Sequence, residues 1–465
     1  MKLKAVFRCQ QCAHEAPKWA GQCPGCGAWN TLAEEVVAFG KDAAAATRAA
    51  RALTPASSGV VRLSEAKGRT LERVPTGVGE LDRLLGGGVV AGQVLLLAGA
   101  PGIGKSTLML QAAAGLAARR KVLYVSGEES LSQVGDRARR LGLDGADVTL
   151  ASETDLDAIL KTIEETAPAA IVLDSIQTVF RQDLTGSPGS VGQVRECAAE
   201  LLRVAKGRDA VLFLLGHVTK DGTTAGPKTL EHLVDTVLQF DSEDRELLRV
   251  LRAEKNRFGP TSEVGLFEMT EKGLRDVVDA SKLFLEDYGG TPTVGRAVSV
   301  TLEGSRPILV EVQALVTPTR YPLARRMATG LDLNRLFTLV AAVEKHLRVR
   351  LDSHDVFVNI AGGLRVKDPA LDLAVCLAVV SSARDRALTS ESVFIGEVGL
   401  LGGVGRVGLL AQRLKEAERV GFRSALVDAR SLKELPKSGT RLGLEVHGAA
   451  DLASALAAAL PGGED

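Results

Sequence analysis

Gly99-Ala100-Pro101-Gly102-Ile103-Gly104-Lys105-Ser106-Thr107 is the stretch that decides the fold of this 465-residue chain. It satisfies the pattern G-x4-G-K-[ST] and lies between the apolar run VLLLA and the helical segment TLMLQAAAGLAA. In such a strand–loop–helix unit, backbone N–H groups converge on phosphate oxygens at the positive end of the helix. Lys105 would neutralise the β/γ charge, and the Ser106 hydroxyl can ligate Mg²⁺. The pattern predicts a site for a nucleoside triphosphate together with Mg²⁺.

Outward from this loop, short apolar runs alternate with helical periods between residues 71 and 280. Buried parallel strands are expected at 94–98, 122–125, 170–173 and 211–215, and crossover helices at 105–118, 130–141, 155–166 and 190–206. This alternation predicts an α/β domain with a mostly parallel sheet and helices on both of its faces.

A separate α+β domain is expected after Gly289–Gly290. Its start, 294–317, is rich in the residue types that favour β-strands. Helices follow near 333–346, 370–382, 408–420 and 449–460, separated by strands near 356–361, 393–397 and 424–428. The expected domains are therefore residues 1–35 with the cysteine pairs, a linker at 36–70, the α/β domain at 71–280 and the α+β domain at 281–465.

Composition excludes several classes of protein. Apolar residues make up 45% and charged residues 25%, which is ordinary globular usage. The longest apolar stretches, 94–104 and 373–383, are shorter than the ~20 residues that cross a bilayer, and the start lacks a signal-peptide core. We therefore expect a cytoplasmic protein. The formal net charge is zero, but residues 319–350 hold seven Lys or Arg against two Asp or Glu. Such a basic segment can bind a polyanion.

Four cysteines form two C-x2-C pairs: Cys9 with Cys12, and Cys23 with Cys26. Each pair can direct two thiolates at one point, so the two pairs complete a closed tetrahedral shell around Zn²⁺. Closed coordination indicates a structural site, and a segment this short would owe its folding largely to the metal. Redox cysteines are the alternative, and His14 is a spare ligand.

Two acidic positions are candidates for catalysis. Asp174 ends the apolar run AAIVLDS, where a carboxylate at a strand's C-terminal edge can hold Mg²⁺; it could instead cap the next helix. Glu128 and Glu129 follow the strand LYVS, and one of them would orient the attacking water. Glu128 is the preferred choice, since Glu129 could equally begin the next helix.

These residues resemble the RecA-like ATPases, and in particular their bacterial DNA-repair members. The resemblance covers nearly the whole chain: the four-cysteine ribbon, TGVGELDRLLGGG, SGEES, LDSIQT, GHVTKDG and the segment Lys255-Asn256-Arg257-Phe258-Gly259. It implies that Lys255 and Arg257 reach the nucleotide of a neighbouring subunit in a homo-hexameric ring. It also implies the recombinase RecA as a partner. His217 and Thr219, at the end of the strand before the second glycine-rich stretch, could sense the γ-phosphate; the alternative for His217 is that it only satisfies a local hydrogen bond.

The resemblance further implies contacts with DNA. Two glycine-rich stretches, 181–195 and 220–228, correspond to the central-channel loops that hold single-stranded DNA. Neither contains an aromatic residue, which favours contact with the backbone over base stacking. The candidate loop cations are Arg181, Arg195, Lys220 and Lys228. The basic segment 319–350 supplies the candidate duplex contacts Arg320, Arg325, Arg326 and Arg335.

Residues 291–460 resemble the proteolytic domain of Lon, in VKDPALDLAVCLAVVSS and IGEVGLLGGVGRVGLLAQRLKEAERVGF. Lon uses a Ser–Lys dyad, and the corresponding positions are Ala370 and Ala411, which cannot do that chemistry. Ser381, Ser382 and Lys415 are out of register with the dyad. The domain is expected to support assembly and DNA binding without proteolysis.

Together these features predict a DNA-dependent ATPase and helicase. It would bind single-stranded and branched DNA and promote branch migration in homologous recombination and DNA repair. Two alternatives stay open. One is a nucleotide-switched adaptor that recruits repair partners through the zinc ribbon, and the other is an ATP-dependent serine protease.

Overall fold

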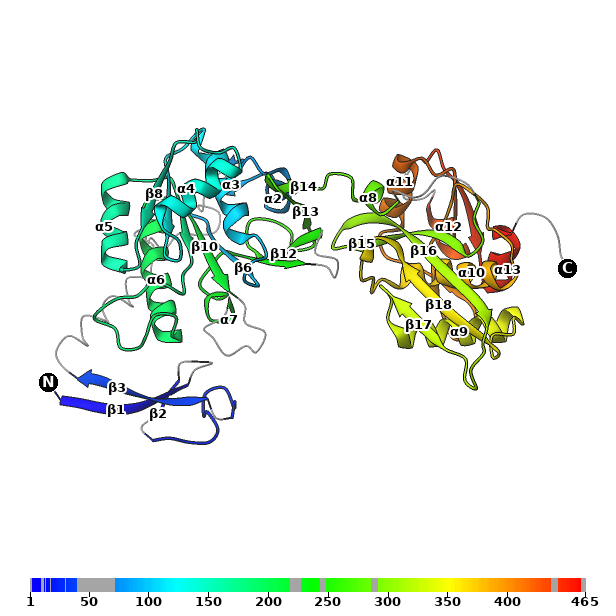
Figure 1. The fold of residues 1–465 in the computed structure, drawn as a ribbon, viewed down its shortest axis with the longest axis horizontal. Coiled ribbons are helices and arrows are strands. Elements are labelled where there is room, and N and C mark those ends of the chain that lie inside the picture. The colour runs from blue at the N-terminus through cyan, green and yellow to red at the C-terminus, as the bar shows by residue number, and fades with distance from the viewer. Residues whose placement is uncertain are drawn as a thin grey trace, which may run out of the picture. The chain divides into compact units, whose positions relative to one another are not determined.

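The structure is a computed structural model that describes residues 2–9, 12, 14–16, 18–29, 31–39, 72–217, 227–242, 248–285, 292–435 and 442–460. The chain divides into two compact units, with the boundary between Asp276 and Val277 (Figure 1). The expected linker lies outside the described residues from residue 40 onward. None of the described helices has the length and hydropathy to cross a bilayer.

The cysteine segment forms a small antiparallel sheet with the strand order β2-β1-β3. Its strands are β1 (Lys2–Cys9), β2 (Glu15–Ala16) and β3 (Leu32–Phe39). Its buried apolar cluster consists of Cys9, Ala16, Cys23 and Leu32. Because two of these four residues are cysteines, the segment has little core without a metal. Strand β3 continues four residues past the domain boundary expected at residue 35.

A nine-stranded sheet forms the centre of the α/β domain. Its strands are β6 (Val94–Gly99), β7 (Val122–Ser126), β8 (Val148–Ser152), β9 (Ala170–Asp174), β10 (Val211–His217), β11 (Thr236–Ser242), β12 (Leu248–Asn256), β13 (Val264–Thr270) and β14 (Gly273–Asp276). Their order is β14-β13-β12-β11-β6-β10-β9-β7-β8. The six strands from β11 to β8 are parallel, and β12, β13 and β14 continue the sheet antiparallel. The mostly parallel sheet is confirmed, and the four predicted strands are β6, β7, β9 and β10.

Helices cover both faces of this sheet (Figure 1). They are α2 (Gly79–Leu84), α3 (Lys105–Ala117), α4 (Leu131–Arg140), α5 (Leu156–Thr166), α6 (Val191–Gly207) and α7 (Pro227–Leu230). Alternate residues of each strand point to opposite faces. In β6, Leu95 and Leu97 pack with α2, α3 and α4, whereas Val94 and Leu96 pack with α5, α6 and α7. The four predicted crossover helices are α3, α4, α5 and α6.

Strands β4 (Arg73–Val74) and β5 (Val89–Val90) flank α2 and form a short antiparallel pair beside this core. Gly88 has φ +127°, and a Cβ there would lie 2.4 Å from the carbonyl oxygen of Val74, so only glycine fits this approach. The Arg73 guanidinium donates to the carbonyl oxygens of Leu85, Gly88 and Phe258. It therefore anchors the segment that contains Phe258.

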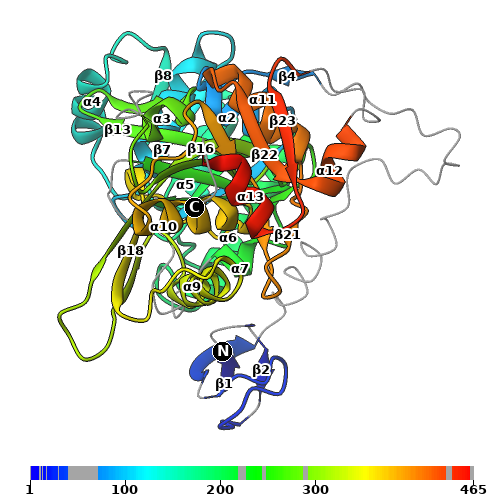
Figure 2. The ribbon, with the colours of Figure 1, turned by 90° about the vertical axis from the view of Figure 1, so that its right-hand side faces the viewer.

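The C-terminal unit contains a four-stranded sheet and a smaller three-stranded sheet (Figure 2). The first sheet has the order β15 (Arg296–Glu303), β16 (Arg306–Pro318), β18 (His354–Ile360) and β17 (Arg326–Thr329). The second is parallel, with the order β19 (Ser392–Phe394), β22 (Ser424–Asp428) and β23 (Glu445–Ala449). The short strands β20 (Glu397–Val398) and β21 (Val404–Gly405) form a hairpin.

Helix α10 (Asp372–Ala383) is the centre of this unit, and it is buried from Asp372 to Ser381. The other helices are α8 (Ala280–Phe284), α9 (Leu333–Leu347), α11 (Leu410–Val420), α12 (Ala429–Glu434) and α13 (Leu452–Ala459). Single 3₁₀ turns occur at Ala361–Gly363 and Pro369–Leu371. The α+β organisation expected from the sequence is confirmed, and the expected strand region 294–317 is the pair β15 and β16.

Candidate active site

The glycine loop joins β6 to α3 at the carboxyl edge of the parallel strands. In the register of the sheet, Gly99 lies between His217 of β10 and Phe240 of β11. Gly104 begins α3 with φ +113°, a conformation that favours glycine, and a Cβ there would lie 2.8 Å from the Met269 side chain. The local sequence thus places the N-terminus of α3 beside the end of β10 and beside Phe240 of β11.

Lys105 is almost fully buried at this edge, with 4% exposure. Its Nζ donates to the carbonyl oxygens of Gly99 and Ala100 at 2.9 and 3.0 Å, and to Nδ1 of His217 at 3.1 Å. Burial lowers the pKa of Lys105 to about 8, although Asp174 and Glu128 oppose that shift. The ammonium group is therefore held at the loop by neutral acceptors, which phosphate oxygens could replace.

Glu128 is held by two hydrogen bonds. Nε2 of His217 donates to Oε1 of Glu128 at 2.9 Å, and Oγ of Ser175 donates to the same oxygen at 2.5 Å. The hydrogen bond from His217 is the main reason that the pKa of Glu128 falls to about 2, with Ser175 and the nearby Lys105 adding to it. Lys105, His217 and Glu128 thus form one connected chain of polar groups.

Glu129 points into a different environment. Its Oε1 pairs with the Arg137 guanidinium of α4 at 2.5 Å, and its backbone N–H donates to Oγ of Ser126. Glu128 and Glu129 are adjacent in sequence, yet Glu128 bonds to His217 in the group around Lys105, whereas Glu129 bonds to Arg137 of α4. This separation supports the choice of Glu128 over Glu129.

Asp174 lies at the end of β9 and is 6% exposed. Burial raises its pKa, while hydrogen bonds from Tyr124 and Ser106 act in the opposite direction. The Tyr124 hydroxyl donates to Oδ2 of Asp174 at 2.6 Å. Asp174 and Ser106 are thus close neighbours, and two such oxygen ligands beside a phosphate site fit a Mg²⁺ ion.

Lys255 and Arg257 lie at the opposite edge of the sheet. Asn256 pairs with Thr236, and Thr236 pairs with Leu95 near the start of β6, whereas the phosphate-binding loop follows the end of β6. From Leu95 to Gly99, the last residue of β6, four residue steps span about 13 Å. In this subunit, Lys255 and Arg257 therefore lie far from Lys105.

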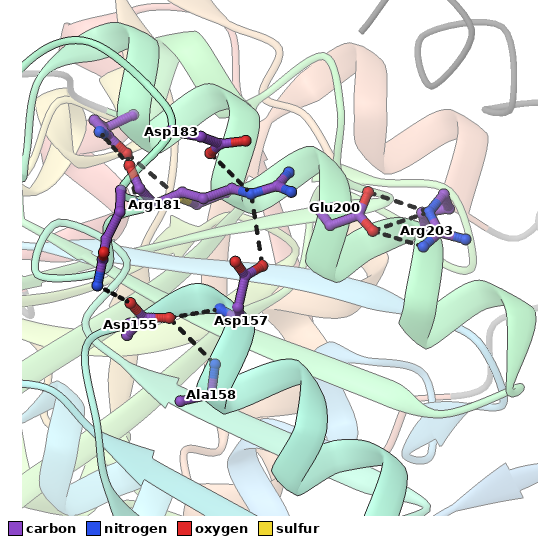
Figure 3. Close-up of polar contacts among 10 residues, drawn as sticks. Asp155, Asp157, Ala158, Arg181, Asp183, Glu200 and Arg203 are labelled. Atoms are coloured by element: carbon purple, nitrogen blue, oxygen red, sulfur yellow. Dashed lines mark hydrogen bonds and ion pairs between the residues drawn. The ribbon is translucent and has the colours of Figure 1, made fainter. Parts of the chain in front are cut away.

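The candidate loop cations have different surroundings. The Arg181 guanidinium lies between the carboxylates of Asp157 and Asp183, at 3.5 and 3.1 Å (Figure 3). The glycine-rich stretch ends at Ser190, so Arg195 is not in the loop but is exposed on the first turns of α6. Lys220 lies outside the described residues, as does the side chain of Lys228 in α7.

The candidate cations of the C-terminal unit also differ in their partners. Arg335 is engaged inside the domain, where its guanidinium binds both oxygens of the buried Asp372 and the carbonyl oxygen of Val398. These bonds join α9 to α10 and to β20. Arg326 donates to the carbonyl oxygens of His354 and Leu351. The remaining two candidates, Arg320 and Arg325, are exposed, and Arg325 pairs with Asp355 at 3.0 Å.

The positions that correspond to the Lon dyad are apolar. Ala370 is fully buried, and the nearby space holds an ion pair between the buried Arg413 and Asp368 at 2.6 Å. The hydroxyls of Ser381 and Ser382 accept backbone N–H groups at 2.9 Å. These serines therefore serve the packing of α10 against the strands around it.

The four cysteine sulfurs converge, and their Sγ atoms all lie within 4.8 Å of one another. Sγ of Cys9 is 3.6 Å from Sγ of Cys26, and Sγ of Cys12 is 3.5 Å from Sγ of Cys23. Tetrahedral Zn²⁺ with bonds of about 2.3 Å requires sulfurs roughly 3.8 Å apart. The arrangement therefore fits a closed zinc site with two ligands from each C-x2-C pair.

Sequence reasoning missed several residues at this site. Tyr124 and Ser175 contact Asp174 and Glu128, and Asp235 contacts Arg257. Ser175 could have been noticed because it follows Asp174 directly. Tyr124 lies inside a strand and Asp235 lies in a turn before β11, and neither position has a local sequence signal.

Comparison with known protein families divides the chain into three matched segments. Residues 7–34 match the rubredoxin metal-binding domain, residues 65–223 match the AAA domain, and residues 337–462 match the C-terminal proteolytic domain of the Lon protease (S16). The zinc ribbon and the Lon-like region expected from the sequence are confirmed by these matches.

Three curated relatives match nearly the full chain, and each is named DNA repair protein RadA. The protein from Bacillus subtilis (strain 168) is 47% identical over 99% of this chain and 100% of its own length. The protein from Halalkalibacterium halodurans is 43% identical over 93% and 94%. The protein from Listeria monocytogenes is 44% identical over 97% and 98%.

Proposed function

The chain belongs to the family of DNA repair proteins RadA, and from that premise we propose that it is a DNA-dependent ATPase and helicase. It would bind single-stranded and branched DNA in the cytoplasm and promote branch migration during homologous recombination and repair. The observation that carries this proposal is the separation of Lys105 from Lys255 and Arg257 to opposite edges of one sheet. A site divided in this way needs a second subunit.

The residues at the carboxyl edge would act on the triphosphate. Lys105 would exchange the carbonyls of Gly99 and Ala100 for phosphate oxygens. Ser106 and Asp174 would hold Mg²⁺, which supplies charge neutralisation when it is bound with ATP. Glu128, kept ionised by His217, would accept a proton from the attacking water.

Lys255 and Arg257 would complete the site of a neighbouring subunit. Cations placed at the phosphates stabilise the charge that develops during transfer. A head-to-tail contact of this kind closes into a ring when the rotation between subunits permits it, and a homo-hexamer is the form that we propose. ATP cleavage would then depend on assembly.

DNA would run along the channel loops and the C-terminal domain. The proposed contacts are Arg181, Arg195, Lys220 and Lys228 in or beside the loops, and Arg320, Arg325 and Arg326 in the basic segment. Arg181 would have to exchange Asp157 and Asp183 for phosphate. We propose that the ribbon extends to Phe39, beyond the bound expected at residue 35, and that the ATPase domain ends at Asp276 instead of residue 280. We also propose the recombinase RecA as a partner.

The test compares ATP turnover by the full chain with single-stranded DNA, with duplex DNA and with none, alongside unwinding of a forked substrate. Single-stranded DNA should stimulate hydrolysis, and Lys105→Ala should abolish both hydrolysis and unwinding. The proposal is refuted if hydrolysis is independent of DNA and the fork stays closed. Full turnover by an isolated single subunit would contradict the divided site.

A nucleotide-switched adaptor is the second candidate, and one observation favours it. Trp19 and Trp29 of the ribbon are 58% and 71% exposed, and both rings lie within 3.9 Å of the position of a Cβ on Gly21. Exposed tryptophans are frequent in the centres of protein interfaces. If Trp29→Ala removes RecA binding and DNA repair while ATP turnover and fork unwinding persist, the main function is the recruitment of a repair partner.

A further inference from the structure

The segment with Lys255 and Arg257 is held by a buried carboxylate that the sequence did not single out. Asp235 is 3% exposed and lies in the turn before β11. Its Oδ2 accepts the backbone N–H of Val94 at 3.1 Å. Its Oδ1 accepts both Nη1 of Arg257 at 3.2 Å and Nζ of Lys206 at 3.1 Å.

The backbone of Asp235 adds two further hydrogen bonds. Its N–H donates to the carbonyl oxygen of Val94 at 3.0 Å, and its carbonyl oxygen accepts the N–H of Arg257 at 3.1 Å. A carboxylate fixed at β6 in this way has little freedom to move. It therefore determines where the Arg257 side chain begins and where its guanidinium lies.

Three cations meet at this edge of the sheet. Lys255 Nζ donates to the carbonyl oxygens of Glu231 and Val234 at 2.6 and 2.8 Å, while Lys206 and Arg257 share Asp235. The side chains of Lys206 and Arg257 are 42% and 57% exposed, so both can still reach a ligand from solvent. Because one buried carboxylate faces two cations, positive charge remains available for an anion.

Lys206 also belongs to the helix that follows the first candidate DNA loop. Helix α6 begins at Val191, directly after the loop ending at Ser190, and Lys206 lies in its last turn. The 17 residues of this helix span about 25 Å. One rigid element thus joins the loop to the cation group.

We propose that Asp235 is a positioning residue for Arg257, and that Lys206 is a third cation acting with Lys255 and Arg257 on the triphosphate of the neighbouring subunit. This inference rests on the proposed function, because it requires the divided site. Asp235 acts only through the two cations. Lys206 would contact the phosphate oxygens directly.

The test uses the full-length chain in its assembled form with saturating single-stranded DNA. Asp235→Asn keeps the shape of the side chain but removes the charge, and Lys206→Gln removes the ammonium group. We expect kcat to fall roughly tenfold to a hundredfold in each variant, with KM for ATP within about threefold of the unmodified protein. Lys206→Arg should restore most of the loss, which a purely structural role of Lys206 would not require.

Arg203 provides a matched control on the same helix. It lies one turn before Lys206, is 46% exposed, and its guanidinium pairs with Glu200 at 2.6 Å (Figure 3). Arg203→Gln removes a cation from α6 without touching Asp235, and its kcat should stay within about twofold. An equal loss in Arg203→Gln and Lys206→Gln would show a general effect of charge and overturn the proposal.

Mixed assemblies separate action on a neighbour from action within one subunit. Lys105→Ala subunits have no functional loop but keep their cations in place. Asp235→Asn subunits keep a functional loop, but their Arg257 is no longer positioned. Mixing the two should restore activity at those junctions that combine an intact loop with intact cations. No gain on mixing, although subunits exchange, would refute the proposal.

Arg257→Ala distinguishes this inference from the proposed function itself. If Arg257→Ala keeps full turnover, the divided site is wrong and the proposed function fails with it. If Arg257→Ala is inactive while Lys206→Gln and Asp235→Asn are unaffected, the divided site survives and only this inference fails. Because Lys206 is a surface residue, its variants should fold, so these outcomes do not depend on Asp235→Asn being stable.

Discussion

The two adjacent glutamates after β7 allow a sharp test of the catalytic carboxylate. Glu128 accepts hydrogen bonds from His217 and Ser175, whereas Glu129 pairs with Arg137 on α4. Replacing each glutamate by glutamine keeps its size and removes its charge. The two variants therefore differ only in which of two neighbouring carboxylates is lost.

The expected magnitudes follow from these contacts. A positioned general base typically contributes 10²–10⁴-fold to a rate, so Glu128→Gln should lower kcat by about that factor. Glu129→Gln weakens a partly buried ion pair and leaves Arg137 with a poorer partner, at a cost of about 1–3 kcal/mol in the free energy of unfolding. Its kcat should stay within about threefold.

The pH dependence gives an independent check. The pKa of Glu128 is lowered to about 2, mainly by the hydrogen bond from His217, so Glu128 stays ionised at every working pH. A group with a depressed pKa contributes stability above its ordinary pKa of about 4.5 and loses it as the pH falls towards 2. His217→Ala should raise the pKa of Glu128 and move the acidic limb of kcat/KM upwards.

The assay is steady-state ATP turnover with saturating single-stranded DNA, together with thermal unfolding of each variant. The reasoning is wrong if Glu129→Gln loses more kcat than Glu128→Gln at equal folded fraction. It is also wrong if His217→Ala leaves the acidic limb where it was. Either result would assign the proton transfer to a different group.

Further predictions concern stability, zinc and phosphate binding. Arg413→Ala should destabilise the C-terminal domain by about 3–5 kcal/mol, because it leaves Asp368 with an uncompensated charge; thermal unfolding with a loss below 1 kcal/mol would contradict this. Cys9→Ser, or a chelator, should unfold the ribbon and release one zinc per chain without changing the melting of the other domains, as zinc analysis and calorimetry would show. ATP affinity should weaken above pH 8, by a factor that approaches about tenfold per pH unit. The reason is that the pKa of Lys105 is about 8 without ligand and the phosphates bind its charged form. An ATP affinity that stays constant between about pH 8 and 9.5 would exclude this.

The fold gives Arg335 a partner within the protein that the sequence does not reveal. Arg335 is a candidate DNA contact by sequence because it lies in a segment rich in Lys and Arg. In the fold its guanidinium binds Asp372, which lies 37 residues away in α10. Sequence reveals the density of charge along a chain, but the pairing of charges depends on which elements pack together.

The sequence alone determined what depends on neighbouring residues: the phosphate-binding loop, the paired cysteines, and the alternation of buried strands and amphipathic helices. Backbone conformation, ligand spacing and hydrophobic period are set within a few residues, so they can be read along the chain. Only the tertiary structure decided how distant groups combine. It joined Glu128 to His217 and Asp235 to Arg257 by hydrogen bonds, and it put Lys105 and Arg257 at opposite edges of one sheet. Strand order and register create these contacts, and no local pattern encodes them.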